Sequence, residues 1–182
     1  MKGLLLLANG FEDTEALATL DCLRRSGLIV YTVSVTNNKK LLTQSNVYVE
    51  ADFVIDEINY QEFDFLVCPG GKAVFQVLDK TVRVNEIVRY FISNNKLSAF
   101  ICAAPHLPGK LGLLENKKYT CFPGCNTQII GGKYYPQMPV VIDGNIITAR
   151  SMAYSIDFAL AIIEKLLGNS QKEKVENSIR GL

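Results

Sequence analysis

The stretch that decides the fold is KLSAFICAAPHLP, residues 96–108. Its run 97–101 is almost entirely apolar and predicts a short buried strand. Cys102 follows at once with two small alanines behind it, and Pro105 is well tolerated in the first turn of a helix. The stretch therefore predicts a strand that turns directly into a helix, interrupted near Pro108-Gly109. A strand followed by a helix is the repeating unit of a parallel sheet.

The same alternation continues along the chain on both sides of this stretch. Apolar and branched runs predict strands over 4–8, 28–35, 63–68, 140–142 and 146–148, with weaker strands or a hairpin over 47–49 and 53–55. Apolar side chains at helical spacing predict helices from 12 to the Ser26-Gly27 pair, over 82–94 and, as the last helix, over 153–167. Asp143-Gly144-Asn145 is a hairpin signal between two of the strands.

Strands that are apolar on both faces and alternate with helices indicate an α/β protein. They predict a mostly parallel central sheet with helices on both faces. Short right-handed crossovers then favour a flavodoxin-like or Rossmann-like three-layer sandwich. The chain has 182 residues, the length of one domain, and no linker or repeat divides it. A single domain over residues 1–182 is expected.

Composition narrows the classes of partner. Hydrophobic residues make up 48% and charged residues 20%, the balance of a globular protein with a buried core. The formal net charge is +1, and no basic block stands out except the polar tail after Gly168, so no nucleic-acid partner is expected. No apolar run approaches the roughly 20 residues of a membrane span, so no membrane partner is expected either.

The N-terminal leucine run and the cysteines both favour a cytoplasmic location. The run ends at Ala8 and acidic residues follow at once, which leaves too short an apolar segment for a secretion signal. Cysteines at 22, 68, 102, 121 and 125 are odd in number, so a disulfide scaffold is not expected. Cys121 and Cys125 are closely spaced, but one histidine in the chain leaves too few ligands for a metal site.

Ligands of such sheets bind beyond the carboxyl ends of the strands, which selects the loops 9–15, 69–73 and 102–106. Cys102 lies in the third loop, at a strand-to-helix turn with the geometry of a nucleophile elbow, and the alanines after it provide the clearance that such a turn needs. A helix N-terminus beside it would lower the pKa of its thiol by about one to several units. The alternative is a small buried cysteine that closes a strand.

The other two loops contain glycines and carboxylates. Pro69-Gly70-Gly71 lets the backbone approach a ligand and can aim N–H groups at a developing oxyanion, although a tight turn also explains it. Glu12, Asp13 and Glu15 occupy a first helical turn, where acidic residues usually cap the helix. A carboxylate beside Cys102 would instead move protons. Which of the acidic residues faces the cysteine is left open.

His106 is the only histidine and the natural base for a Cys–His pair. It comes four residues after Cys102, one helical turn away, and the helix carries its side chain away from the elbow. We interpret it as a surface residue or one that lies behind the site. Without it, a Cys–His–Asp hydrolase is hard to build.

Four segments stand out when they are read together: NGFEDTEALATLDCLRRSG at 9–27, CPGG at 68–71, FICAAP at 100–105 and TARSMAYSIDFALAIIEKLLG at 148–168. In this order they resemble the ThiJ/PfpI superfamily, in the branch of the Parkinsonism-associated redox and deglycase protein. The resemblance covers nearly the full chain. It implies a flavodoxin-like sandwich, usually a homodimer, with a reactive cysteine at a strained elbow and no metal or organic cofactor.

The resemblance also implies roles for single residues. Cys102 matches the reactive cysteine, and Glu15 matches the glutamate that hydrogen-bonds its sulfur. Gly71 matches a glycine that lends its N–H to the oxyanion site, and Ala103 gives the other N–H. Glu12 matches a glutamate at the dimer-side pocket. The predicted site has Cys102 and Glu15 as catalytic residues, with Gly70, Gly71, Ala103 and Glu12 around the oxyanion and substrate pocket.

Other positions relate to the family in different ways. The Arg24-Arg25 pair resembles dimer-interface arginines. Ala103 stands where the protease-like branch has a histidine, so peptidase activity is not expected. Phe122 replaces a histidine of some members, although Asp21 matches its acidic partner. Ser151-Met152-Ala153 replaces a frequent Gly-Pro-Gly, so the substrate pocket is expected to differ from the family pattern.

Two functional hypotheses follow. The first is an enzyme of reactive-carbonyl detoxification, a glutathione-independent glyoxalase or a deglycase. In it the Cys102 thiolate attacks an aldehyde, Glu15 moves protons and the N–H groups of Gly71 and Ala103 hold the oxyanion. The alternative is a redox sensor or stress-response chaperone in which Cys102 is oxidised to a sulfinic acid.

Overall fold

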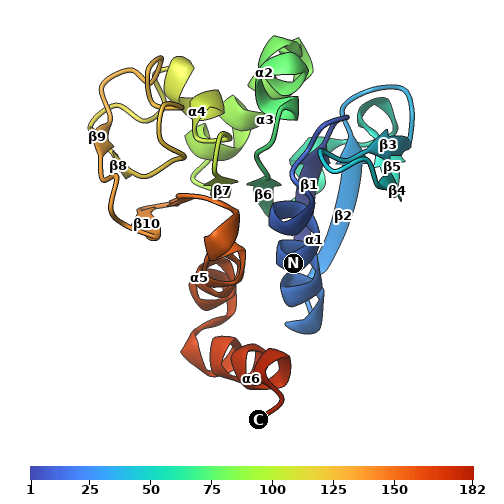
Figure 1. Cartoon of the computed structure of the whole chain (residues 1–182), viewed down its shortest axis with the longest axis vertical. Helices are drawn as coiled ribbons and strands as arrows, with labels where there is room; N and C mark the ends of the chain where they lie inside the picture. The colour runs from blue at the N-terminus through green and yellow to red at the C-terminus, as the bar shows by residue number, and fades with distance from the viewer.

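The computed structural model describes all residues, 1–182, as an α/β sandwich (Figure 1). Its central sheet has seven strands in the order β10-β11-β7-β6-β1-β2-β5. Their bounds are β1 Lys2–Leu7, β2 Ile29–Ser34, β5 Phe53–Val54, β6 Phe65–Cys68, β7 Leu97–Ile101, β10 Val140–Asp143 and β11 Ile146–Ala149. Every neighbouring pair is parallel except β10 and β11, which form the predicted hairpin. The prediction of a flavodoxin-like fold with a mostly parallel sheet is confirmed.

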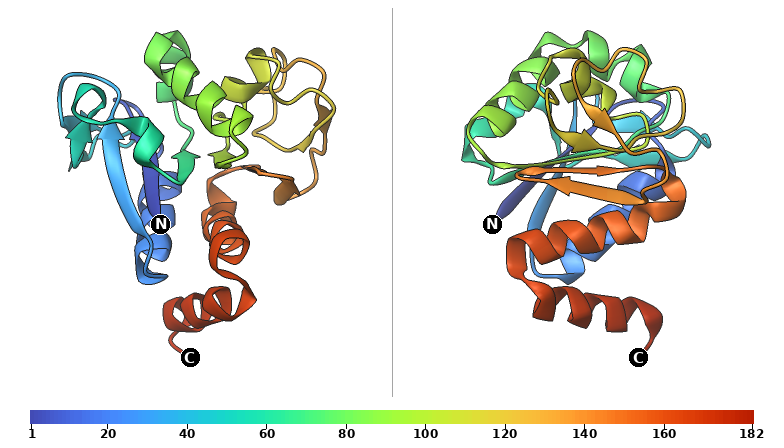
Figure 2. Two further views of the ribbon diagram at one scale, coloured as in Figure 1. Left: turned by 180° about the vertical axis from the view of Figure 1, so that it is seen from behind. Right: turned by 90° about the vertical axis from the view of Figure 1, so that its left-hand side faces the viewer.

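Helices cover both faces of this sheet. Their bounds are α1 Asp13–Arg25, α2 Ala73–Gln76, α3 Val82–Ser93, α4 His106–Lys110, α5 Ser155–Leu167 and α6 Asn169–Arg180, with 3-10 turns at Ile55–Glu57, Tyr60–Glu62, Leu78–Lys80 and Met152–Tyr154. The right-hand view of Figure 2 places α1, α5 and α6 on one side of the sheet and α2, α3 and α4 on the other. None of these helices is both long and apolar enough to cross a membrane.

The helix predicted over 153–167 is α5, which ends at Leu167, but the prediction that it is the last helix is wrong, because α6 follows Gly168 (Figure 1). Its sequence is mostly polar and predicts only a tail. It packs mainly against α5, and Val175 is its one buried side chain. Gln171 Nε2 also donates a hydrogen bond to Ser26 O at 3.0 Å. So narrow an apolar face gives little periodic signal in the sequence.

Two small sheets lie outside the central one. β3 (Lys40–Leu42) pairs antiparallel with β4 (Tyr48–Glu50), and β8 (Lys118–Tyr119) pairs with β9 (Lys133–Tyr134). The weak signals at 47–49 and 53–55 therefore do not form a hairpin with each other. The second of them becomes β5, which joins the edge of the central sheet beside β2.

β1 lies at the centre of the core. It is hydrogen-bonded to β2 on one side and β6 on the other. Helices cover both faces of the sheet, so the side chains on either face of β1 are buried. Leu4, Leu5 and Leu6 each have 0% of their surface exposed. A strand in this position must be apolar throughout, which is why the leucine run is a reliable strand signal.

Leu5→Ala is expected to lower the free energy of unfolding by about 2–5 kcal/mol, because a central strand cannot move to fill the space that the side chain leaves. Urea denaturation followed by circular dichroism measures this change. Val82→Ala is the control, since Val82 is 71% exposed at the start of α3, and it is expected to cost less than about 0.5 kcal/mol. Equal unfolding midpoints for the two variants would contradict this view of the core.

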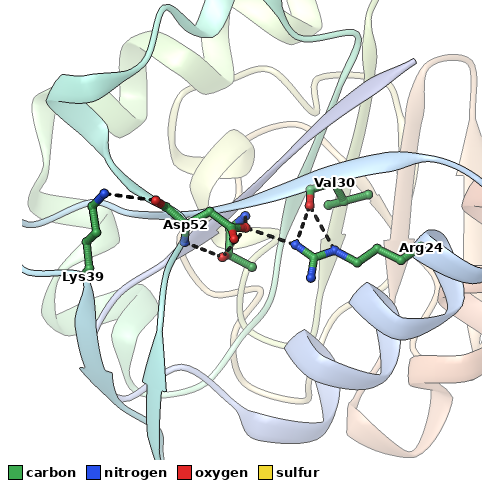
Figure 3. Close-up of polar contacts among 5 residues, drawn as sticks. Arg24, Val30, Lys39 and Asp52 are labelled. Atoms are coloured by element: carbon green, nitrogen blue, oxygen red, sulfur yellow. Dashed lines mark hydrogen bonds and ion pairs between the residues drawn. The ribbon is translucent and has the colours of Figure 1, made fainter.

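The end of α1 is tied to the sheet by Arg24 (Figure 3). Its Nε and Nη2 donate to Val30 O at 3.2 and 2.8 Å, and Nη2 also donates to Asp52 Oδ2 at 3.1 Å. The same carboxylate oxygen accepts from the N–H and hydroxyl of Thr32 at 2.8 and 2.9 Å, while Lys39 donates to Asp52 O at 3.1 Å. Arg24 therefore has a structural role within the chain.

Arg25 also has a partner within the chain. Its Nε donates to Asp21 Oδ2 at 2.7 Å, one helical turn earlier on α1. The family resemblance pairs Asp21 with a histidine that this chain lacks, and Asp21 forms an ion pair with Arg25 instead. Contacts of the Arg24-Arg25 pair with a second subunit stay a prediction.

Candidate active site

The three loops selected from the sequence meet at one edge of the central sheet. They follow β1, β6 and β7, which are neighbours in the sheet, so their carboxyl ends lie side by side. Glu12 N–H donates to Gly70 O at 3.1 Å, and Phe11 pairs with Gly71 in an isolated bridge. Beside these loops lies a pocket of about 550 Å³, a volume typical of small-molecule sites.

Five of the six predicted site residues line this pocket: Glu12, Glu15, Gly71, Cys102 and Ala103. They come from parts of the chain that are up to about ninety residues apart, and only the strand order of the sheet brings them together. The sixth, Gly70, does not line the pocket.

Cys102 occupies a strained turn. Its φ angle is 63°, in the left-handed region, which costs a residue other than glycine about 1–2 kcal/mol. Two hydrogen bonds hold it there: its N–H donates to Ala149 O at 2.9 Å and its carbonyl accepts from Phe122 N–H at 2.8 Å. Such strain is typical of functional positions, where the surrounding structure forces one residue into an unfavourable conformation.

The prediction that a helix N-terminus lowers the pKa of Cys102 is wrong. The residues 102–105 form turns, and α4 begins only at His106 and is five residues long. Burial raises the pKa of the Cys102 thiol, and the Glu15 carboxylate raises it further by its charge and by its hydrogen bond, while the Ala103 N–H has a smaller, lowering effect. Burial and the carboxyl group beside it therefore both keep the cysteine protonated.

Glu15 is the acidic residue that faces the cysteine. It is fully buried, and its Oε2 accepts from Gly70 N–H at 2.7 Å. Its Oε1 is buried and has no hydrogen-bond partner. Burial raises the pKa of Glu15 to about 7. Hydrogen bonds from the Cys102 thiol and the Gly70 N–H oppose this shift, and the nearby Glu12 adds to it.

Glu15 and Cys102 act as one titrating pair. A carboxyl group with a pKa of about 7 is protonated for a large part of the time near neutral pH. In that state its charge no longer adds to the raised pKa of the thiol, although burial, the larger cause, still raises it. Attack on a carbonyl therefore requires the thiol proton to pass to the Glu15 carboxylate, which then carries it as the acid beside the thiolate.

The two glycines have different roles. Gly70 N–H donates to Glu15, so it is not free to hold an oxyanion, and the place of Gly70 in the predicted oxyanion and substrate pocket stays a prediction. Gly71 has φ of 91°, and a Cβ there would lie 2.5 Å from Glu12 N and Gly10 O. Its N–H donates to no acceptor in the chain. A free N–H is what an oxyanion site needs, and the Ala103 N–H likewise donates to no acceptor except the neighbouring sulfur.

Gly70→Ala is expected to separate Glu15 from Cys102. A Cβ at this position would lie 2.7 Å from Glu15 Oε2, 2.8 Å from Cys102 Cβ and 3.0 Å from Ala103 N. We expect a loss of about 1–3 kcal/mol in unfolding free energy from overpacking, together with a changed pH dependence of Cys102 alkylation by iodoacetamide. Chemical denaturation and alkylation rates from pH 5 to 9 measure both.

Gly112→Ala is the control for that variant. Gly112 has φ of 74°, and a Cβ there would have no atom within 4 Å. Gly112→Ala therefore tests backbone strain without a collision, and we expect it to lower the free energy of unfolding by about 1 kcal/mol. If Gly112→Ala were the more costly change, or if alkylation of Cys102 were the same in Gly70→Ala as in the wild type, the close approach at Gly70 would not matter.

The other acidic residues of the loop have separate partners. Glu12 caps α1, because its Oε2 accepts from Glu15 N–H at 2.7 Å, and it also lines the pocket. Asp13 Oδ2 accepts from Ser45 N–H at 3.2 Å and anchors the β3–β4 hairpin. The capping role that the sequence leaves open thus falls to Glu12.

His106 lies behind the pocket. It is buried, with Nε2 3.4 Å from Asp79 Oδ1, and its ring centroid is 4.8 Å from that of Phe75, which lines the pocket. Burial lowers its pKa. It does not line the pocket with Cys102, which agrees with the interpretation that it lies behind the site and excludes the surface alternative.

Four lining residues have no role in the sequence analysis: Gln44, Lys72, Phe75 and Cys125. Lys72 and Phe75 follow the Gly70-Gly71 turn and belong to the selected loop or its helix. Gln44 and Cys125 come from loops that follow no strand of the central sheet, so no positional rule selects them. Phe122 and Met152 also line the pocket, at 47% and 50% exposed, and give its mouth an apolar rim.

These observations define a class of protein: a flavodoxin-like α/β sandwich with a cysteine elbow above a buried glutamate at the carboxyl edge of its sheet. A sequence profile of the DJ-1/PfpI family matches residues 1–165. The protein dj-1beta of Drosophila melanogaster is 32% identical over 182 residues, covering 100% of this chain and 96% of that protein. The deglycase PfpI of Pyrococcus furiosus is 36% identical over 156 residues, covering 82% and 90%.

A solved structure agrees with these relatives. The crystal structure of Drosophila melanogaster DJ-1beta matches with a TM-score of 0.92 at 30% identity, over 98% of this chain and 96% of that one. The chain belongs to the DJ-1/PfpI family.

Proposed function

We propose that this protein is a cysteine-dependent enzyme that detoxifies reactive carbonyls, as a glutathione-independent glyoxalase or as a deglycase, through a single domain over residues 1–182. One observation carries the proposal: the buried Glu15 carboxyl, whose pKa is raised to about 7, lies beside Cys102 in the pocket. The deglycase name of the Pyrococcus furiosus relative supports chemistry of this kind.

The first step is addition to an aldehyde. The Cys102 thiolate attacks the aldehyde carbon of methylglyoxal, and the carbonyl π electrons move to the oxygen. Gly71 and Ala103 each offer a free N–H at the pocket wall to the resulting oxyanion. Glu15 then gives its proton to this oxygen, which leaves a neutral hemithioacetal and a carboxylate.

The second step moves two protons between the two carbons and their oxygens. The Glu15 carboxylate removes the proton from the former aldehyde carbon while the neighbouring ketone oxygen takes up a proton, which gives an enediol. Glu15 returns its proton to the second carbon and the hydroxyl on the first carbon loses its proton, so that the first carbon becomes the carbonyl of a lactate thioester. Water hydrolyses the thioester and frees the thiol. The sum is methylglyoxal plus water giving lactate, without a redox cofactor or a metal. In a deglycase, the carbonyl arrives as an adduct of an amine or thiol.

Peptidase activity is not part of the proposal. Ala103 stands where the protease-like branch has a histidine, and His106 lies against Asp79 and Phe75. No imidazole therefore serves Cys102 as a base.

The proposal includes a homodimer in the cytoplasm, as the family resemblance implies. Val47 and Tyr48 support a dimer, because they are 53% and 66% exposed on a hairpin whose loop supplies Gln44 to the pocket. Apolar side chains so exposed are better covered by a partner. Light scattering after size exclusion would give twice the chain mass for a dimer, and a monomer mass would contradict it.

Lactate formation from methylglyoxal without glutathione tests the function. The native protein is expected to form lactate. Protein whose Cys102 has been alkylated by iodoacetamide is expected to form none. A second assay uses the preformed adduct of methylglyoxal with N-acetylcysteine, which slowly releases free aldehyde by itself. A deglycase consumes the adduct faster than this spontaneous release, whereas a glyoxalase forms lactate no faster than the adduct releases aldehyde.

The alternative function gives a different result. A redox sensor would form no lactate above the alkylated control, and peroxide would add two oxygens to Cys102 in its intact mass. Buried Glu15, when protonated, and the Ala103 N–H are the donors that would hold the sulfinate. Absence of lactate from either substrate would overturn the enzyme proposal.

A further inference from the structure

A second cysteine shares the pocket with Cys102. Cys125 lines the same cavity and is partly exposed to it, and both cysteines are free thiols. The remaining cysteines do not line the pocket: Cys22, Cys68 and Cys121 are buried in the core. The chemistry of the proposed function uses Cys102 and leaves Cys125 without a role.

The backbone links the two cysteines directly. Cys102 O accepts from Phe122 N–H at 2.8 Å, and Phe122 O accepts from Cys125 N–H at 3.0 Å. The turn that carries Cys125 is therefore attached to the strained elbow residue itself. In addition, a charge on the Cys125 sulfur contributes to the raised pKa of Cys102, which means that the two sulfurs interact through space.

The segment around Cys125 has few constraints that would oppose a small movement. No helix or strand lies between β8, which ends at Tyr119, and β9, which begins at Lys133. Gly124 adjoins the cysteine with φ of 89° and no atom within 4 Å of a Cβ. A disulfide requires Cα atoms within about 7 Å of each other, and a turn without ladder hydrogen bonds adjusts more easily than a sheet.

We propose that Cys125 is the resolving thiol of a redox reaction at Cys102, which gives this protein a hydroperoxide-reducing activity besides its carbonyl chemistry. The Cys102 thiolate attacks the outer oxygen of a hydroperoxide, the O–O bond breaks, and a proton converts the leaving alkoxide into an alcohol. Cys102 becomes a sulfenic acid. The Cys125 thiol then attacks this sulfur, the S–O bond breaks, and the two cysteines form a disulfide with release of water.

The electrons balance in this sequence. Two thiols are oxidised to one disulfide while one hydroperoxide is reduced to an alcohol and water. A second turnover needs a dithiol that reduces the disulfide by thiol exchange. Capture by Cys125 also competes with further oxidation of Cys102 to a sulfinic acid, which is irreversible in most proteins. The inference does not depend on carbonyl turnover, because it concerns the oxidised cysteine.

Intact mass after peroxide treatment tests the proposal. Fully reduced protein is exposed to hydrogen peroxide, quenched with an alkylating reagent and analysed without reduction. The wild type is expected to lose about 2 Da and to take up two fewer alkyl groups, and dithiothreitol should reverse both changes. Tryptic peptides covering residues 97–110 and 119–133 should appear as one cross-linked species.

Cys121 and Cys125 lie on the same tryptic peptide, so the cross-linked species alone does not identify the partner of Cys102. Single variants of the two cysteines identify it. Cys125→Ser is expected to lose the cross-link and to gain about 16 and then 32 Da on Cys102. Cys125→Ala serves as a second version in case the serine variant folds poorly. Cys121→Ser is the matched control and should still form the cross-link. A stopped assay of hydroperoxide consumption with dithiothreitol should show multiple turnovers for the wild type and a loss for Cys125→Ser.

Three results would overturn the proposal. One is accumulation of sulfinic acid at Cys102 at the same rate in the wild type and in Cys125→Ser. Another is a cross-link that disappears in Cys121→Ser and persists in Cys125→Ser. The third is an intermolecular disulfide as the sole product, seen as a doubled mass. None of these depends on lactate formation, so failure of the proposed function and failure of this inference are distinguishable.

Discussion

Cys102→Ala is expected to lower lactate formation from methylglyoxal by about 10³-fold or more, since it removes the only nucleophile at the elbow. Cys102→Ser should be nearly as inactive. A serine hydroxyl has no base in the site strong enough to activate it, because His106 packs against Phe75 and does not line the pocket. Initial rates at saturating substrate measure the effect, with far-UV circular dichroism to show that each variant is folded.

The control for both variants is Cys121→Ser. Cys121 is fully buried and does not line the pocket, so its replacement should leave the rate within about twofold of the wild type after correction for folded protein. If Cys102→Ala kept more than a tenth of the wild-type rate, a residue other than Cys102 would have to form the bond to substrate.

Glu15→Gln is expected to reduce kcat by about 10²–10⁴-fold with little change in KM, because the amide retains the shape of the side chain but cannot transfer protons. In the wild type, the rate should also fall as the pH rises through about 7, where the paired carboxyl group loses the proton that the oxyanion needs. Glu15→Gln should lack this fall. Rates between pH 5 and 9 measure both effects.

Stability gives an independent measurement of the same group. The pKa of Glu15 is raised in the folded protein from 4.5 to about 7. The neutral carboxyl is therefore favoured by folding at low pH, and this advantage disappears as the pH rises through 4.5 to 7. The wild type should lose about 3 kcal/mol of unfolding free energy over this range relative to Glu15→Gln. Parallel stability curves for the two proteins would contradict a raised pKa at this site.

The pocket mouth is where this chain departs from the pattern that the family resemblance implies. The residues 151–153 and Phe122 occupy positions where the family resemblance leads one to expect other residue types. Both segments line the pocket, and Phe122 also holds the Cys102 carbonyl through its N–H. A change at position 122 therefore affects the rim through its side chain, while the backbone contact to the elbow is retained.

The sequence by itself determined the layers of the fold. Central strands such as β1 and β7 are buried on both faces, so their residues are almost all apolar. Helix α1 is bounded by a capping residue and a Ser-Gly pair. The hairpin of β10 and β11 was evident from its Asp-Gly-Asn turn. The loop containing Cys102 followed from the same reasoning, since strand ends in a parallel sheet meet at one edge. Helix α6 escaped detection because its docking face has so few apolar residues.

Only the tertiary structure decided which groups touch. Three acidic residues share one helical turn, and the packing of α1 against the elbow gave Glu12 the cap and Glu15 the sulfur. Burial, which no local pattern reveals, raised the pKa of Glu15 and reversed the direction expected for Cys102. Cys125 reached the pocket through an irregular loop. Pairing, desolvation and loop placement depend on residues far apart in the chain, so local spacing does not specify them.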